Sequence, residues 1–254
     1  MTEEELLTLL VGLFGTVTSS FLFNITESSY LDVIFKAGNS GANELALGVD
    51  MLPATPSISN YLDQMLSESS VNISNTFKKD FNKILEKSKG GTKKELESKI
   101  SKMFDRYKTG DKIEQIAETE ASATANFARL EVVQQYNVPV KKEWLTQMDD
   151  KVRDSHLIDG QLRELADLFD LTDGEKALYP GDPNLPAQDR INERCFLTYN
   201  NNGVSYAGVT PEDRDSYWLK QRSEIEVYKN IIKESYKKAF EDIEQKINKL
   251  IKEV

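Results

Sequence analysis

The chain has little cysteine, histidine or proline, and no strongly basic segment. Its 254 residues include one cysteine, one histidine and seven prolines. A single cysteine, Cys195, excludes a disulfide within the chain. The formal net charge is -10, and without a strongly basic segment a large surface that neutralises phosphates is not expected. A local nucleic-acid contact is predicted at most for residues 78–112, which hold twelve basic and six acidic residues.

Long hydrophobic runs are also scarce. The longest, from Leu6 to Phe23, is interrupted by glycines and hydroxyl residues, and a membrane span needs about 20 mostly apolar residues. Three glutamates precede the run, which is unlike a secretory signal. We predict a helix that is buried or packed against a partner, with a membrane-active segment as the alternative. Membrane contact is not expected, and the following residues, to position 56, are predicted to form a connector rich in Gly and Pro.

From Ser57 onward, apolar residues recur at spacings of three and four, which predicts helices. The first helix is expected to stop at Gly90-Gly91. Thr92 and Glu95 form a capping-box pattern that starts the second helix. A third is predicted from Lys112 to about Tyr136, and a short strand over residues 140–146.

The last 43 residues, from Glu212, form a charge-balanced pattern with a narrow apolar stripe. Such a stripe, sustained over many turns, is typical of helix pairing or a coiled-coil contact. We therefore predict a long helix that binds a partner or a second copy of the chain. The predicted partner-binding residues are Trp218, Ile225, Tyr228, Ile232, Tyr236, Phe240, Ile243 and Ile247.

These patterns predict a mainly helical α+β protein in four regions. They are an apolar segment with its connector (1–56), a helical region (57–137), a small mixed α/β domain (138–211) and a long amphipathic helix (212–254).

The third region collects the rare residue types, including His156, Cys195 and Trp144. A Cys–His pair could act in nucleophilic catalysis, but no Gly-rich turn or helix N-terminus precedes Cys195 to lower its pKa. A metal could use His156, Glu193 and Cys195, with Asp159 or Asp182 as a fourth ligand. Structural zinc sites usually have at least two thiolates, so we predict no metal and no cofactor. The favoured interpretation is a buried His–Cys pair that joins the two ends of an irregular segment.

The same residues carry a resemblance to a known family. The region has the order Trp144-Leu-Thr146, Asp149-Asp-Lys-Val-Arg153, Ser155-His156 and Asp159-Gly-Gln161, then Pro180-Gly-Asp-Pro183 and Ile191-Asn-Glu-Arg-Cys195. This order resembles the phage Mu F-like minor head protein family, also called phage head morphogenesis proteins. The preceding helix fits too, through Thr119-Glu120, Ala125-Asn126 and Arg129. Two positions depart from the family's pattern: Glu193 stands where the family has a first Cys, and Glu118 where an Arg usually precedes Thr-Glu.

The resemblance implies a structural, non-enzymatic protein of the virion of a tailed bacteriophage or prophage. It would lie at the portal vertex or capsid interior, bind the portal or major capsid protein, and aid head assembly, DNA packaging or ejection. Ten residues are predicted to hold the motif together: Trp144, Asp149, Arg153, His156, Asp159, Gly160, Gln161, Asn192, Arg194 and Cys195. The alternative is a toxin-type or metal-dependent enzyme that uses His156 and Cys195.

Overall fold

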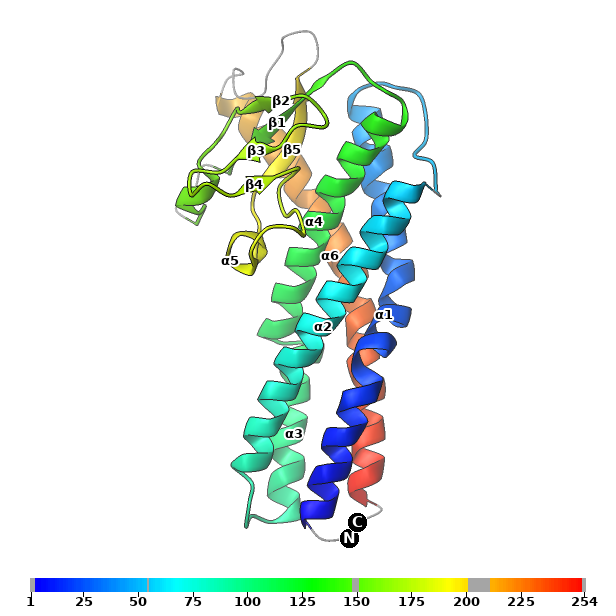
Figure 1. The fold of residues 1–254 in the computed structure, drawn as a ribbon, viewed down its shortest axis with the longest axis vertical. Coiled ribbons are helices and arrows are strands. Elements are labelled where there is room, and N and C mark those ends of the chain that lie inside the picture. Colours follow the sequence, from blue (N-terminus) through cyan, green and yellow to red (C-terminus); the bar gives the residue numbers. More distant parts are fainter. Residues whose placement is uncertain (1–2, 54, 148–150, 201–210, 253–254) are drawn as a thin grey trace. The chain divides into compact units, whose positions relative to one another are not determined.

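The computed structural model describes residues 3–53, 55–147, 151–200 and 211–252, with the side chains of residues 1–21, 23, 25 and 211–214 outside the description. The helices are α1 (Glu3–Glu44), α2 (Pro56–Glu86), α3 (Lys93–Lys108), α4 (Asp111–Gln135), the short α5 (Ala187–Arg190) and α6 (Pro211–Lys252), with a 3-10 turn η1 (Asp154–His156). The strands are β1 (Lys141–Leu145), β2 (Leu162–Arg163), β3 (Phe169–Asp170), β4 (Lys176–Ala177) and β5 (Phe196–Asn200). Figure 1 shows all five strands falling between α4 and α6 along the chain. The predicted mainly helical α+β fold is confirmed. No helix in the described ranges combines the length and the hydrophobicity that crossing a membrane requires.

Helix α1 is longer than the sequence suggested. The expected connector was to occupy the residues after the apolar run, but α1 continues to Glu44. The glycines that were taken as helix breakers are contact points instead. A Cβ on Gly38 would lie 2.0 Å from the Met51 sulfur, and one on Gly41 would lie 3.5 Å from the Arg129 backbone. The connector is therefore limited to the residues between α1 and α2, where Ala46 and Gly48 have positive φ.

The predicted start of α3 is confirmed by its cap. The Thr92 hydroxyl accepts from the Glu95 N–H at 3.3 Å, and the Glu95 carboxylate accepts from the Thr92 N–H at 2.9 Å. These reciprocal bonds satisfy two N–H groups that have no partner within the helix.

The chain divides into two compact units, each assembled from separate segments. Residues 1–29, 61–114 and 233–254 make up the first, and residues 30–60 and 115–232 the second. The first unit is helical and has an aromatic core. Phe77 lies 5.2 Å from Phe104, 4.9 Å from Tyr107 and 5.4 Å from Phe240, measured between ring centroids. Ring pairs at such distances stabilise beyond the area they bury.

The second unit contains the strands. β1 lies between β2 and β5 in a three-stranded antiparallel sheet, and β3 pairs with β4 in a separate ribbon. Trp144 on β1 faces Leu197 on β5 in the register of the pair. The strand predicted over residues 140–146 is confirmed as β1. Within this unit α4 is buried continuously from Thr119 to Val133.

The stripe on α6 needs a correction. Seven of the eight residues predicted to bind a partner are 0–5% exposed within this single chain: Ile225, Tyr228, Ile232, Tyr236, Phe240, Ile243 and Ile247. The eighth, Trp218, is half-buried against Phe196, with ring centroids 6.1 Å apart. The stripe is continuous because α6 supplies core residues to both units in succession. These side chains belong to the chain's own core rather than to a free docking face.

Candidate functional site

The Asp-Gly-Gln segment of the motif lies along strand β1. The Trp144 N–H donates to the Gln161 carbonyl at 3.1 Å, and the Gly160 N–H donates to the Trp144 carbonyl at 2.9 Å. The Asp159 carboxylate accepts from the Thr146 N–H at 2.7 Å. Gly160 has a φ of 74°, in the left-handed region that favours glycine. The segment thus extends the pairing of β1 beyond β2.

The Gln161 side chain joins this segment to the small ribbon. Its amide oxygen accepts from the Asp170 N–H at 2.8 Å, and its amide nitrogen donates to the Asp170 carbonyl at 3.2 Å. This pair of bonds imitates one rung of a β-ladder, so a side chain completes the pairing that the backbone does not make.

The centre of the region is a buried cluster around His156. Its Nδ1 lies 3.0 Å from Glu193 Oε2 and 3.9 Å from Cys195 Sγ. Its Nε2 lies 4.0 Å from Asp189 Oδ1. The ring meets Trp144 edge-on, with centroids 5.4 Å apart and planes at 90°. His156, Glu193 and Cys195 are each 1% exposed, so the only histidine and the only cysteine of the chain meet in its interior.

The local fold of residues 191–195 places two of these groups. Glu193 Oε1 accepts from the N–H groups of Arg194 and Cys195, both at 2.8 Å. This turn directs the second carboxylate oxygen toward His156. Asn192, at a φ of 58°, donates its N–H to the Thr119 hydroxyl of α4 at 3.0 Å. The Arg153 guanidinium donates to the Ile191 carbonyl and fixes the same segment from its other side.

The environment of Cys195 does not favour a nucleophile. Burial raises the pKa of its thiol well above the ordinary value, and the Glu193 carboxylate adds to this rise. The nearby side chains of Trp144 and Thr146 act in the opposite direction on the pKa but do not outweigh burial. A nucleophilic cysteine needs the thiolate and access to substrate, and this sulfur is closed off at 1% exposure.

Asn126 on α4 anchors the irregular segment to the helix. Its amide nitrogen donates to the carbonyls of Pro180 and Cys195 at 3.0 and 3.2 Å. Its amide oxygen accepts from the Leu197 N–H at 2.9 Å. One fully buried side chain therefore forms three hydrogen bonds to the backbone at three places in the motif.

Arg129, one helical turn further along, is the second anchor. It donates to Glu44, to the Leu197 carbonyl at 3.2 Å and to the Tyr217 hydroxyl at 3.0 Å. It is 2% exposed, and its charge is compensated by the carboxylate of Glu44 on α1. A buried guanidinium paired and hydrogen-bonded in this way is costly to disturb from either side. Asn126 and Arg129 could be singled out in the sequence only through the family resemblance. A polar residue within the run of small residues on α4 was the signal that could have marked them.

The Pro-Gly-Asp-Pro turn is ordered by Asp182. Its carboxylate accepts from the Leu178 N–H at 2.7 Å and from both the N–H and the side-chain amide of Asn184 at 2.9 Å. Asp182 and Asp159, the two candidates for a fourth metal ligand, are thus each engaged in turns. Neither belongs to the group of His156, Glu193 and Cys195, whose donor atoms lie within 4.8 Å of one another.

The predicted motif residues take several positions. Trp144, His156 and Cys195 meet at the buried cluster. The segment 159–161 lies along β1, while Arg153 and Asn192 hold the chain before Glu193. Arg194 takes part through its backbone N–H. Asp149 lies outside the described residues. Their roles in the function of the protein stay predictions.

Glu118, where the family pattern has a basic residue, has its partners on α6. Its carboxylate is paired with Arg222, and Lys229 Nζ lies 3.4 Å away. An acidic residue on α4 is therefore matched by basic residues on α6.

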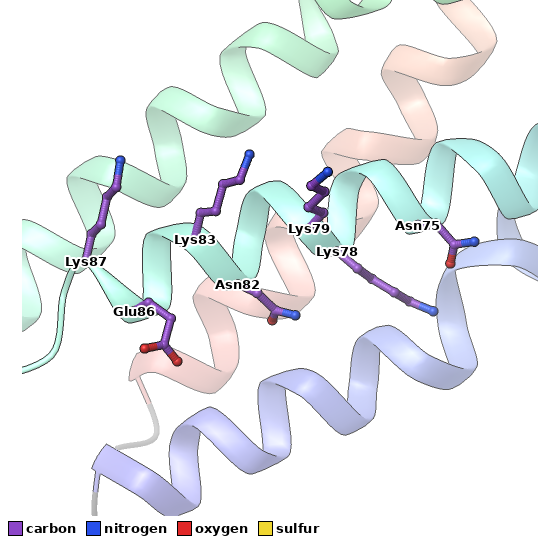
Figure 2. Close-up of a pocket in the computed structure, with 7 residues that line it drawn as sticks. All are labelled: Asn75, Lys78, Lys79, Asn82, Lys83, Glu86 and Lys87. Atoms are coloured by element: carbon purple, nitrogen blue, oxygen red, sulfur yellow. The ribbon is translucent and has the colours of Figure 1, made fainter. Parts of the chain in front are cut away.

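A second candidate site is a surface pocket along α2. It is lined by Asn75, Lys78, Lys79, Asn82, Lys83, Glu86 and Lys87. Figure 2 shows Lys79, Lys83 and Lys87 extending from one side of the helix, as their spacing of four residues requires. These residues fall at the start of the stretch for which a local nucleic-acid contact was predicted.

Part of the chain matches a known protein family. Residues 83–198 match the family model described as phage Mu protein F like protein. The match begins earlier than the motifs that carried the resemblance and ends at β5. Searches of curated proteins and of solved structures found no match. The match supports the predicted family and suggests a phage head morphogenesis protein. Residues 83–198, a little under half of the chain, are therefore similar to phage Mu protein F like proteins.

Proposed function

We propose that this protein is a minor structural component of a tailed-phage head that contacts the portal or the capsid interior and aids head assembly, DNA packaging or ejection. The observation that carries the proposal is the internal use of the motif residues. The side chains that could do chemistry are buried at 1% exposure and lie against one another. Together with the family match, this favours a rigid module over a catalytic centre.

Contacts with a partner would have to use exposed side chains, because the α6 stripe is buried. On the part of α6 within the second unit, Leu219 and Val227 are 62% and 53% exposed. In the motif region, Leu157 and Leu168 are 51% and 44% exposed. Large apolar side chains of this kind support a protein-binding role, although singly they are common on any surface.

The experiment is co-expression of the chain with the portal and major capsid proteins encoded in the same phage or prophage. Size-exclusion chromatography and native mass spectrometry of the purified particles would then measure incorporation. We expect the chain to co-elute with portal or with capsid shells at a fixed copy number. A chain that stays separate from both proteins, while folded by circular dichroism, would contradict the proposal.

A Cys195→Ser chain separates the structural proposal from the enzymatic alternative. Serine is close to cysteine in size but carries a hydroxyl in place of the thiol. If the folded variant still enters particles and supports infectious phage, no thiol chemistry is needed. A folded variant that enters particles but yields no infectious phage would favour the enzyme instead.

Contact with packaged DNA is a second candidate function, favoured by the pocket on α2. Lys79, Lys83 and Lys87 are exposed along one side of the helix and could pair with successive phosphates. The acidic neighbours limit the effect, because Glu86 already pairs with Lys89 at 2.9 Å and Asp80 lies 3.9 Å from Lys83. We therefore expect weak, sequence-independent binding that depends on salt.

Fluorescence anisotropy with a labelled duplex tests this. The triple change of Lys79, Lys83 and Lys87 to Gln should weaken binding and reduce the slope of log K against log[salt] by up to about 3, since each phosphate contact contributes about 0.9. The control is the same change at Lys238, Lys246 and Lys252, three exposed lysines of α6. Equal affinity of the two triple variants would remove this site from consideration.

A further inference from the structure

We propose that His156, Glu193 and Cys195 bind a divalent transition-metal ion, with zinc as the best chemical fit. The three residues offer one imidazole nitrogen, one carboxylate oxygen and one sulfur, and these atoms lie within 4.8 Å of one another. Ligands of a single zinc ion have bond lengths of about 2.0 to 2.3 Å, so neighbouring donors are separated by roughly 3 to 4 Å. The observed spacings of 3.0 Å from Nδ1 to Oε2 and 3.9 Å from Nδ1 to Sγ fall in this range.

The independent observation is a buried carboxylate oxygen that lacks a suitable partner. Glu193 is 1% exposed, and its Oε2 accepts no hydrogen bond of good geometry although Nδ1 is only 3.0 Å away. A buried carboxylate oxygen left in this state is costly. Oε1 is already occupied by the N–H groups of Arg194 and Cys195. A cation between Nδ1, Oε2 and Sγ would satisfy the remaining oxygen and both other atoms together.

A carboxylate, that of Asp189, lies near Nε2 on the opposite side of the imidazole from the proposed ion. Asp189 Oδ1 lies 4.0 Å from Nε2, and the Ser155 hydroxyl holds that oxygen at 2.9 Å. Metal-binding histidines usually donate their other ring N–H to a carboxylate, which fixes the tautomer and strengthens the nitrogen as a ligand. In the proposal, Asp189 Oδ1 moves within hydrogen-bonding distance of Nε2 when the ion binds, and so acts as a positioning residue without coordinating the ion.

The donor set selects the class of ion. A thiolate and an imidazole suit zinc, cobalt and related ions, whereas magnesium and calcium prefer oxygen donors alone. Sites with one thiolate are less usual than sites with two or more. Here a carboxylate takes the place of a second sulfur, and a water molecule would complete the set. The ion would tie η1 to the segment before β5, so its role would be structural. The inference does not depend on the proposed head function.

Cobalt(II) is the direct probe, because a thiolate bound to cobalt gives a charge-transfer absorption that carboxylate or nitrogen sites lack. The full chain, treated with chelator and then given one equivalent of cobalt, should show this band and lose it when zinc is added. Cobalt binding without the band would place the metal elsewhere and overturn the proposal, as would no binding at all. The result stands without any variant, so it is decisive even if changes at the cluster prevent folding.

Zinc affinity, measured by competition with a chromogenic chelator, tests each residue. Cys195→Ser and Glu193→Gln should weaken zinc binding most, and Glu193→Gln keeps the oxygen that accepts from the two N–H groups. Asp189→Asn should weaken binding by about 10- to 100-fold, as expected for a residue that orients a ligand. The matched control is Glu164→Gln, an exposed carboxylate paired with Lys141. Equal zinc affinity of Cys195→Ser and the control, with both folded by circular dichroism, would refute the assignment.

Discussion

The close approach of the Pro-Gly-Asp-Pro turn to α4 gives the sharpest stability prediction. Gly181 has a φ of 80°, and a Cβ at this position would lie 3.0 Å from the Ala123 Cα and 3.1 Å from its Cβ. Gly174 provides a matched control, since its φ is 93° but a Cβ there would meet nothing within 4 Å. Both glycines therefore have a positive φ that disfavours alanine, but only at Gly181 would an added Cβ also crowd a neighbouring residue. Comparing Gly181→Ala with Gly174→Ala separates the two.

The expected magnitudes follow from these two demands. An L-residue in the left-handed region costs about 1–2 kcal/mol, and alanine recovers about 0.4–1 kcal/mol by restricting the unfolded chain. Gly174→Ala should thus lower the free energy of unfolding by about 1 kcal/mol. Gly181→Ala adds overpacking against a helix backbone, which costs about 1–3 kcal/mol more. The total for Gly181→Ala is about 2–4 kcal/mol.

Urea denaturation followed by tryptophan fluorescence measures the difference. Both tryptophans, Trp144 and Trp218, belong to the second unit, which also contains Gly181 and Gly174. A Gly181→Ala change that costs no more than Gly174→Ala would refute the close approach to α4. Adding Ala123→Gly to Gly181→Ala should recover part of the loss, because it removes the 3.1 Å contact but not the 3.0 Å contact with the backbone.

Three further predictions concern a lysine, a thiol and a cap. Desolvation lowers the pKa of buried Lys142 from 10.5 to about 8, so between these values the unfolded chain holds a proton that the folded chain has released. The free energy of unfolding, compared with that of a Lys142→Met chain, should accordingly rise by up to about 3 kcal/mol from pH 8 to 10.5. Urea midpoints that change equally with pH in both chains would contradict this. The Cys195 thiol, buried and with a raised pKa, should react with Ellman's reagent far more slowly in native protein than in denaturant, and equal rates would show that the sulfur is accessible. Thr92→Ala should destabilise by about 1 kcal/mol through loss of the α3 cap, measured as a lower urea midpoint against a Thr76→Ala control on α2.

The helices were predictable because their apolar spacing is local. The burial of Ile58, Phe77, Ile100 and Ile113 follows the spacings of three and four read from the sequence. The start of α3 followed from two residues, Thr92 and Glu95, whose side chains each bond to the other's backbone N–H. In each case the pattern that predicts the helix lies within a few residues along the chain, even where the contacts that bury it are distant in sequence.

The extent of α1 and the role of the α6 stripe were not predictable in this way. Glycines within a helical pattern indicate either a break or a close contact, and the choice depends on what lies opposite. Gly38 faces Met51 and Gly41 faces Arg129, neither of which is near in sequence. The α6 stripe likewise specifies an apolar face without saying what covers it, and its residues are buried by the same chain.

The contacts that hold the candidate site in place were only partly predictable from the sequence. That His156 and Cys195 would meet followed from their rarity, but their anchors did not, because the partners of Asn126 are backbone groups at Pro180, Cys195 and Leu197. A backbone carbonyl is present at every residue and an N–H at every residue except proline, so no side-chain pattern in the irregular segment can mark them as partners. The information lies on α4 instead, where a polar side chain surrounded by small residues faces the segment. It follows that side chains at positions 180 and 197 could change with little effect on these bonds, while Asn126→Leu, which is similar in size, should leave one N–H and two carbonyls without partners.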